Sequence, residues 1–263
     1  MRGATWFTAL TNVHSPELRH SAAVWAADAP LGDARARFLA VVPDPANRFP
    51  RARQGEVGIE QAYALAREVR AVIGQNMRPI VAVVDVRSQA YGREEEALGL
   101  HRACAEAVAA YADARAAGHP VVALIVGRAM SGAFLAHGYQ ANRILALDDP
   151  GVLVHAMSKE AAARVTRRSV EELEALGHEV LPMAYSIRAY EKLGLLHALL
   201  QGVNADAPSN EDVVRVKDEL ARAADDARKG PRDLSSRLAA PQARRTRAAS
   251  VEVRRLMALQ WNG

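Results

Sequence analysis

The chain has 263 residues, of which 50% are hydrophobic, and a formal net charge of +4. A chain of this size can bury one large core, so we expect one main domain with appended segments. The single cysteine excludes an internal disulfide, and no apolar run approaches the ~20 residues of a membrane helix.

Acidic and basic residues are mixed along most of the chain, and aromatic residues are not interleaved with the basic ones. A nucleic-acid surface needs basic patches with side chains that can stack on bases, so this pattern disfavours one. The first residues lack the continuous apolar segment of a secretory signal. We therefore expect a cytoplasmic protein that binds neither a membrane nor nucleic acid.

We predict a three-part organisation of the chain. Residues 1–36 form an N-terminal arm whose two tryptophans pack onto the domain or onto a partner, and residues 37–205 form the core. Residues 206–263 form a C-terminal helical extension, which becomes rich in arginine after a break at Gly230-Pro231. The arginines are typical of a solvated helical face, and docking against a partner is the alternative.

Apolar residues along the chain alternate between the short runs of strands and the spacing of helices. The predicted strands are residues 38–42, 80–84, 121–126, 143–147 and 152–155. The predicted helices are residues 59–75, 93–117 and 134–140, then helices that start after N-caps at Ser158 and Ser169, and one from residue 211. Such alternation predicts an α/β fold with a mostly parallel sheet covered by helices.

The stretch after the strand at 121–126 consists mainly of small residues, from Gly127 to Ala133, before a helix continues at Phe134. A strand that feeds a helix through such a turn leaves backbone N–H groups without partners. Such groups suit a developing oxyanion. Close packing of the helix on the sheet explains the same small residues, and both interpretations stay open at this point.

A nucleophilic serine is one alternative use of this turn. Ser131, His155 and Asp206 follow one another in the order of the Ser–His–Asp arrangement of Clp-type peptidases. The residues around Ser131 lack the first Gly of a G-x-S-x-G elbow. The histidines are scattered and there is no phosphate-binding glycine motif, so we expect neither a metal nor a bound cofactor.

Several segments together resemble one family. The segment Asp85–Gly99 resembles the corresponding segment of acyl-CoA carboxyltransferase subunits, and Arg128–Phe134 resembles their Gly-Gly-Ala oxyanion turn. The more specific similarity is to the gamma subunit of biotin-independent malonate decarboxylase, in the carboxyltransferase-like branch of the crotonase superfamily. It rests on SQAYGR at 88–93, GHP at 118–120, SGAFLAHG at 131–138, VHAM at 154–157, RVT at 164–166 and GPRDLSSRL at 230–238.

This resemblance implies a crotonase/ClpP-like fold of repeated ββα units with C-terminal helices. It also implies one half of an enzyme that is active only with a beta subunit, the active site lying between the two. The implied substrate is a malonyl thioester on an acyl carrier protein, carried by its phosphoribosyl-dephospho-CoA group, and the products are the acetyl thioester and CO₂. An acyl carrier protein transferase subunit is a further implied partner, and this chain itself binds no cofactor.

The chain departs from the carboxyltransferase pattern in two places. Arg87-Ser88-Gln89 stands where those subunits usually have Pro-Gly-Phe, and Ser131 replaces one Gly of their turn. Both changes argue against transfer of a carboxyl group to biotin. The alternatives to the decarboxylase are a Clp-like serine hydrolase, a carboxyltransferase subunit of a biotin-dependent enzyme, and a non-catalytic scaffold half.

Two sets of residues are the candidate site. The catalytic set is the turn Ser131, Gly132 and Ala133, whose backbone N–H groups are predicted to hold the oxyanion. The substrate-binding set is the loop that starts the helix at 93, and it contains Gln89, Tyr91, Gly92 and Glu95. The alternative for this loop is structural, with Tyr91 packed on the sheet and the glutamates favouring the helix start.

Overall fold

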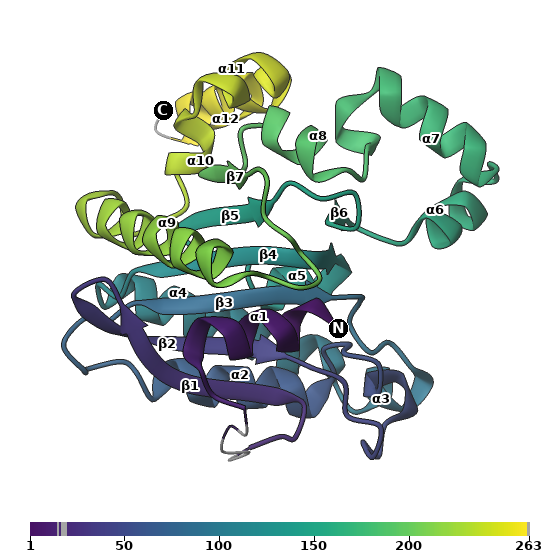
Figure 1. The fold of residues 1–263 in the computed structure, drawn as a ribbon. Helices are drawn as coiled ribbons and strands as arrows, with labels where there is room; N and C mark the ends of the chain where they lie inside the picture. The colour runs from purple at the N-terminus through teal and green to yellow at the C-terminus, as the bar shows by residue number, and fades with distance from the viewer. Residues whose placement is uncertain (15, 17–19, 262–263) are drawn as a thin grey trace.

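The computed structural model describes residues 1–14, 16 and 20–261 (Figure 1). Its described part contains one seven-stranded sheet in the order β1-β2-β3-β4-β5-β7, and β6 pairs with the far end of β4. Among the strands of this described sheet, β1 and β2 pair antiparallel and the other pairs are parallel. The strands are β1 (Val24–Leu31), β2 (Ala34–Val41), β3 (Ile80–Val86), β4 (Val121–Met130), β5 (Arg143–Leu147), β6 (Leu153–His155) and β7 (Ala198–Leu200).

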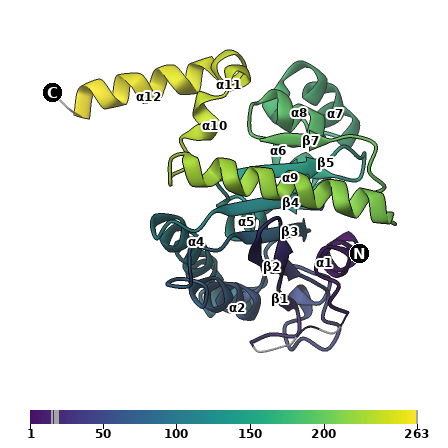
Figure 2. The same cartoon turned by 60° about the vertical axis from the view of Figure 1, so that its left-hand side comes forward.

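Helices cover both faces of this sheet (Figures 1 and 2). One face carries α2 (Ile59–Arg70), α4 (Leu100–Ala116) and α5 (Ser131–Ala136), and the other carries α1 (Arg2–Thr11) and α9 (Asn210–Lys229). The remaining helices are α3 (Arg93–Ala97), α6 (Lys159–Thr166), α7 (Val170–Glu179), α8 (Ile187–Lys192), α10 (Ser236–Ala239), α11 (Pro241–Thr246) and α12 (Ala248–Trp261), with short 3₁₀ turns at Pro50–Ala52 and Leu181–Met183.

The predicted alternation of strands and helices is confirmed. Ser158 and Ser169 cap α6 and α7 through their side-chain oxygens, and Ser169 forms a full capping box. The prediction of one helix over 93–117 is wrong, because the chain breaks into α3 and α4 at Gly99, whose φ is +90°. Glycine adopts this left-handed conformation without the steric cost that other residues have.

The first residues pack against one face of the sheet as α1. Trp6, Phe7 and Leu10 of α1 are fully buried, and the Trp6 indole N–H donates to the Ala205 carbonyl at 2.9 Å. The boundaries of the three predicted parts stay a prediction. The predicted N-terminal and C-terminal parts include a few positions outside the described residues, namely 15, 17–19, 262 and 263.

The core consists of aliphatic side chains on the central strands. All seven residues of β3 are buried, as are nine of the ten in β4, in keeping with near-continuous Val, Ile, Leu and Ala runs. Each such valine or leucine contributes roughly 1.5–3 kcal/mol when it is fully buried. In the part of the chain that the structure describes, no helix has the length and apolarity that crossing a membrane requires.

The buried His137 links this core to the helix after β4. Its Nδ1 lies 3.0 Å from the Tyr111 hydroxyl, and its Nε2 lies 3.1 Å from the Val83 carbonyl. Burial raises the pKa of Tyr111, so the hydroxyl stays protonated and donates a hydrogen bond to Nδ1. The Nε2–H of a neutral imidazole then donates to Val83, and burial lowers the pKa of His137 to about 4.

We predict that His137 makes stability depend on pH. The pKa falls from 6.5 in an exposed ring to about 4 in the fold, so stability is complete above pH 6.5 and is lost as the pH falls toward 4. The loss is about 3 kcal/mol, and denaturant unfolding at several pH values measures it. His137→Gln should flatten this slope and the exposed His101→Gln should not, whereas equal slopes for wild type and His137→Gln contradict the prediction.

Candidate active site

Two segments that follow neighbouring strands meet at the carboxyl edge of the sheet. Residues 87–92 follow β3, and the turn at residues 131–133 follows β4. The N–H of Gly132 donates to Oε1 of Gln89 at 2.9 Å, although the two residues are 43 positions apart. A Cβ at Gly132 would lie 3.2 Å from the same oxygen, which is tighter than an ordinary contact. The structure thus brings together one predicted residue from each set.

Ser131 holds the turn in an unusual backbone conformation. Its φ is +58°, in the left-handed region that costs a non-glycine residue roughly 1 kcal/mol. Its hydroxyl donates to the Ala156 carbonyl at 2.8 Å, which ties the turn to the segment after β6. This bond fixes the turn through the serine side chain, and the backbone of the next residue faces Gln89.

A cavity of about 350 Å³ lies beside the turn, between β6 and the segment that leads into α8. Phe134 packs edge-on against Tyr139 and Tyr190, with ring centroids 5.5 and 6.4 Å apart. The lining is otherwise mostly aliphatic, with polar groups from the turn and from one histidine. It comprises Ser131, Gly132, Phe134, Leu135, Tyr139, Val154, His155, Ala156, Pro182, Ala184, Tyr190 and Leu193.

His155 lines the cavity without contacting the serine. Its ring stacks on Tyr185 at a centroid distance of 3.9 Å, and its Nδ1 lies 3.2 Å from the Met157 carbonyl and 3.3 Å from the Met157 nitrogen. Burial lowers the pKa of His155, so the ring is uncharged at neutral pH. Asp206 makes two hydrogen bonds with Arg2 instead. The Ser131, His155 and Asp206 triad of the hydrolase alternative is therefore not assembled.

The loop after β3 is held by a short backbone pairing. Val57 accepts from the Ala90 N–H at 2.9 Å and donates to the Ser88 carbonyl at 3.0 Å, so both neighbours of Gln89 are fixed. Tyr91 is 49% exposed and lies under the Arg51 guanidinium, 5.6 Å from the ring centre. Tyr91 neither packs on the sheet nor lines the cavity.

Gly92 and Glu95 form the start of α3. The carboxylate of Glu95 lies directly against Gly92, where any Cβ would collide with it. Glu95 is 4% exposed, and its Oε1 makes no hydrogen bond within the described residues. Neither residue lines the cavity described above, and neither does Gln89. Gln89 contacts the turn at residues 131–133 through its hydrogen bond with the Gly132 N–H.

The Asp85 side chain holds β3 and β4 together just before the two loops begin. Its side chain lies where the register of β3 against β4 shifts, and it accepts hydrogen bonds from the N–H groups of Gly3 and Arg128, both at 3.1 Å. Gly127 leaves room for the carboxylate, because a Cβ there would collide with Oδ1. One carboxylate thus joins α1, β3 and β4 immediately before the segments that carry Gln89 and Gly132.

The residues that sequence reasoning missed are this anchor and the aromatic lining of the cavity. In the sequence, Asp85 only follows the apolar run 80–84 and begins the segment Asp85–Gly99, and neither pattern predicts its hydrogen bonds to Gly3 and Arg128. Tyr139 and Tyr190 come from separate parts of the chain, and no local pattern marks them as neighbours of Phe134. Among the described residues, no cluster of three His, Cys, Asp or Glu side chains could hold a metal ion.

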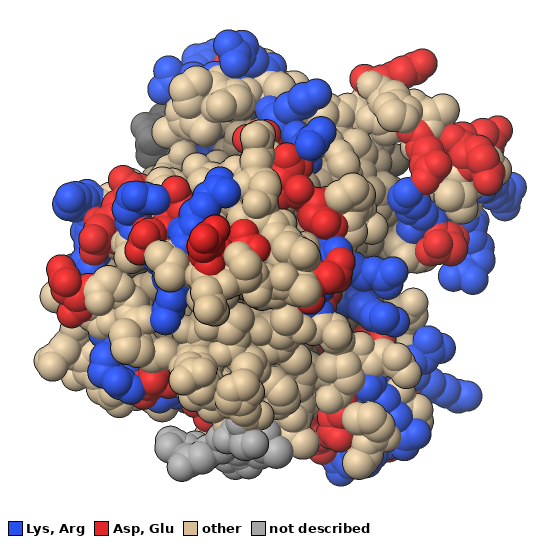
Figure 3. Space-filling model, viewed as in Figure 1, with Lys and Arg blue, Asp and Glu red and all other residues tan. Residues whose placement is uncertain are grey.

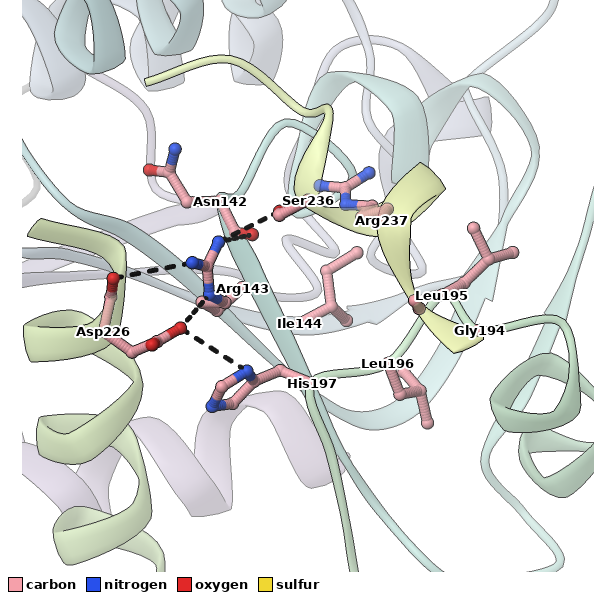
Figure 4. A pocket seen from close by; sticks show the side chains of 11 residues that line it. Asn142, Arg143, Ile144, Gly194, Leu195, Leu196, His197, Asp226, Ser236 and Arg237 are labelled. Carbon is pink, nitrogen blue, oxygen red and sulfur yellow. Dashed lines mark hydrogen bonds and ion pairs between the residues drawn. The ribbon is translucent and has the colours of Figure 1, made fainter. Parts of the chain in front are cut away.

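A second cavity, of about 250 Å³, lies at the start of β5 and thus at the opposite edge of the sheet (Figure 4). Arg143 is 8% exposed and bonds to Asp226 of α9 and to the Ser236 hydroxyl of α10. Arg237 donates to the Tyr139 carbonyl at 2.6 Å, just after α5. These arginines attach the C-terminal extension to the body of the protein.

We predict that Asp85 is a large contributor to stability. Asp85→Ala leaves one buried and one part-buried N–H group without an acceptor, and it should lower the free energy of unfolding by about 2–4 kcal/mol. Asp85→Asn keeps an acceptor oxygen and should cost less, and exposed Asp33→Ala should change little. Denaturant unfolding of the three variants measures this, and equal effects of Asp85→Ala and Asp33→Ala would contradict it.

Comparison with known proteins adds a family and close relatives. A family model described as malonate decarboxylase gamma subunit matches residues 52–261. A Malonomonas rubra protein, malonyl-S-ACP:biotin-protein carboxyltransferase MADD, is 33% identical over 192 residues, which span 70% of this chain and 66% of that protein.

Solved structures show the same fold. A chain in a Pseudomonas malonate decarboxylase hetero-tetramer with coenzyme A is 55% identical, with a TM-score of 0.93 and 99% of both chains covered. A chain in a Pseudomonas MdcD-MdcE hetero-dimer is 53% identical, with a TM-score of 0.91 and the same coverage of 99%. Transcarboxylase 12S is 17% identical with a TM-score of 0.64 over 87% of this chain and 40% of its own, which shows a common fold alone. The predicted crotonase-type α/β fold is confirmed.

Proposed function

The chain belongs to the malonate decarboxylase gamma-subunit family, and from this premise we propose that the N–H groups of its turn at residues 131–133 stabilise the enolate formed on decarboxylation. The substrate is a malonyl thioester on an acyl carrier protein, held by a phosphoribosyl-dephospho-CoA group. A beta subunit completes the site, and an acyl carrier protein transferase subunit belongs to the same assembly. The MdcD-MdcE hetero-dimer and the hetero-tetramer of the Pseudomonas relatives support a partner subunit.

The chemistry requires a place for negative charge. When CO₂ leaves a malonyl thioester, the electron pair of the broken C–C bond delocalises onto the thioester oxygen. A preorganised N–H donor directed at that oxygen lowers the barrier by ~3–4 kcal/mol. The α-carbon then takes up a proton, which gives the acetyl thioester.

One observation carries the proposal. An amide oxygen, that of Gln89, already lies on the Gly132 N–H at 2.9 Å. A thioester carbonyl offers the same kind of acceptor, and donors of an oxyanion hole lie ~2.7–3.1 Å from the oxygen that they stabilise. This N–H therefore points at a position that a carbonyl oxygen can occupy.

The cavity beside the turn suits the leaving carboxylate. The cavity has a largely apolar wall, to which Phe134, Leu135, Val154 and Leu193 contribute. Dispersal of the carboxylate charge as neutral CO₂ forms is favoured where water is excluded. The volume of about 350 Å³ falls at the small end of the ~300–1,000 Å³ of ligand sites, which fits a malonyl head group better than a whole coenzyme.

A basic surface on and after α6 suits a carrier arm that bears phosphate. Figure 3 shows Lys and Arg side chains gathered below the acidic α7. The exposed Arg164, Arg167 and Arg168 belong to α6 and the turn after it, which follow the cavity-lining β6 in the chain. Such charges attract an anionic group before any specific contact forms.

Transfer of the carboxyl group to biotin is a second candidate, because the Malonomonas rubra relative is named for that reaction. In that case the carboxyl group leaves for a biotinyl acceptor rather than as free CO₂. The segment Arg87-Ser88-Gln89 and Ser131 depart from the pattern of biotin-dependent subunits, and this favours direct release.

We expect decarboxylation to require the partner subunit. The purified chain should release little ¹⁴CO₂ from a malonyl thioester on its carrier protein, and the complex with the beta subunit should release it at least a hundredfold faster. Avidin, which sequesters biotin, should leave the rate unchanged. Full activity of the single chain would refute the obligate partner, and inhibition by avidin would favour the biotin candidate.

We expect the Gly132 N–H to be essential. Gly132→Pro removes this donor, so turnover by the complex should fall by about 10²–10³. Gel filtration should show that the complex still assembles. Unchanged turnover would remove the assigned role.

Ser131→Gly separates backbone from hydroxyl chemistry, because glycine accepts the positive φ of this position. Turnover should fall less than tenfold, whereas loss of a nucleophile costs about 10⁶. Labelling of the wild-type Ser131 by a fluorophosphonate would instead support the serine hydrolase.

If Gly132→Pro and alanine changes at Gln89 leave the kinetics of the complex unaltered, the chain serves as a non-catalytic scaffold.

A further inference from the structure

We propose that Gln89 gates the oxyanion site: its side-chain amide accepts the hydrogen bond of the Gly132 N–H, and the thioester oxygen must displace it. This inference rests on the proposed function for the identity of the ligand. It adds a competing internal acceptor and a residue that sets the affinity for the substrate. The ligand class is a thioester carbonyl, whose oxygen takes the position of the glutamine oxygen.

The geometry separates a fixed backbone from a movable side chain. The neighbours Ser88 and Ala90 both form backbone hydrogen bonds with Val57, so the backbone of Gln89 is fixed in place. The side chain is half-buried, and its hydrogen bond to the Gly132 N–H at 2.9 Å is the one recorded for its amide among the described residues. Rotation of the side chain therefore breaks one neutral hydrogen bond and needs no rearrangement of the strands.

The fit between the two groups is close. A Cβ at Gly132 would lie 3.2 Å from Oε1 and 3.3 Å from Cδ of Gln89, so the amide lies directly against the glycine. Gln89 and a substrate oxygen cannot accept from this N–H at the same ideal position. Binding of the thioester thus exchanges one carbonyl acceptor for another, and the exchange reduces the net gain from the new bond.

Two substitutions of Gln89 should change the KM for the malonyl thioester in opposite directions. Gln89→Ala removes the competitor, so the KM of the complex for the malonyl thioester should fall about three- to tenfold, with kcat nearly unchanged. Gln89→Glu places a carboxylate on the N–H, and such charge-assisted bonds are stronger than neutral ones. The KM of Gln89→Glu should rise at least tenfold at pH 8 and return toward the wild-type value as the carboxylate is protonated.

A readout without turnover tests the same gate. Hydrogen–deuterium exchange of the peptide that contains Gly132 should be faster in the Gln89→Ala chain than in wild type, because the bond that protects this amide is gone. The matched pair Gln201→Ala and Gln201→Glu changes an exposed glutamine and should reproduce the wild-type exchange and KM.

The outcomes separate the gate from a structural role and from the proposed function. Equal exchange in wild type and Gln89→Ala overturns the gate, as does a Gln89→Glu enzyme whose KM equals that of wild type at every pH. A drop in kcat common to both variants, with no pH dependence, also overturns it, since it indicates a structural role. If the wild-type complex does not decarboxylate the thioester, the proposed function fails, and the exchange experiment still decides whether Gln89 holds the Gly132 amide.

Discussion

The carboxylate of Asp85 is the constraint on which the candidate site depends. β3 and β4 lose their common register at this position, so their backbone groups no longer pair regularly. Asp85 accepts from the Arg128 N–H of β4 and from the Gly3 N–H at the start of α1, and it thereby fixes α1 and the end of β4 to β3. The two loops that carry Gln89 and Gly132 leave the sheet directly above it. The buried carboxylate thus supplies hydrogen bonds at an irregular part of the sheet, where regular pairing between the strands is interrupted.

The chemistry that we propose for this site needs few side chains. Ser131 holds a strained backbone with its hydroxyl, Gly132 presents an N–H, and aromatic rings close the cavity beside them. Each contribution comes from position rather than from reactivity, which fits a reaction whose main demand is a stable place for an enolate charge. The uncharged His155 and the engaged Ser131 hydroxyl are consistent with this division of roles.

Sequence reasoning succeeded where the interaction is local. The caps at Ser158 and Ser169 bond within three residues, and the buried strands are continuous apolar runs, so both were predictable. It was wrong about the helix over 93–117, because a glycine between two helical patterns need not interrupt them in sequence. Three features depend on how strands and helices stack: the pairing of Gln89 with Gly132, the anchoring by Asp85, and the packing of Tyr190 on Phe134. Chain order indicates that the loops share an edge, yet it gives no distance between them.

The contact between Asp85 and Gly127 also restricts how the sequence of this region can vary. A side chain at Gly127 collides with the carboxylate, so any larger residue there requires a smaller residue at position 85. That smaller residue would abandon the N–H groups of Gly3 and Arg128. Neither single substitution is then a neutral step, and the double substitution passes through an unstable intermediate. The two positions form an epistatic pair, and they should persist together or be replaced together with the backbone around them.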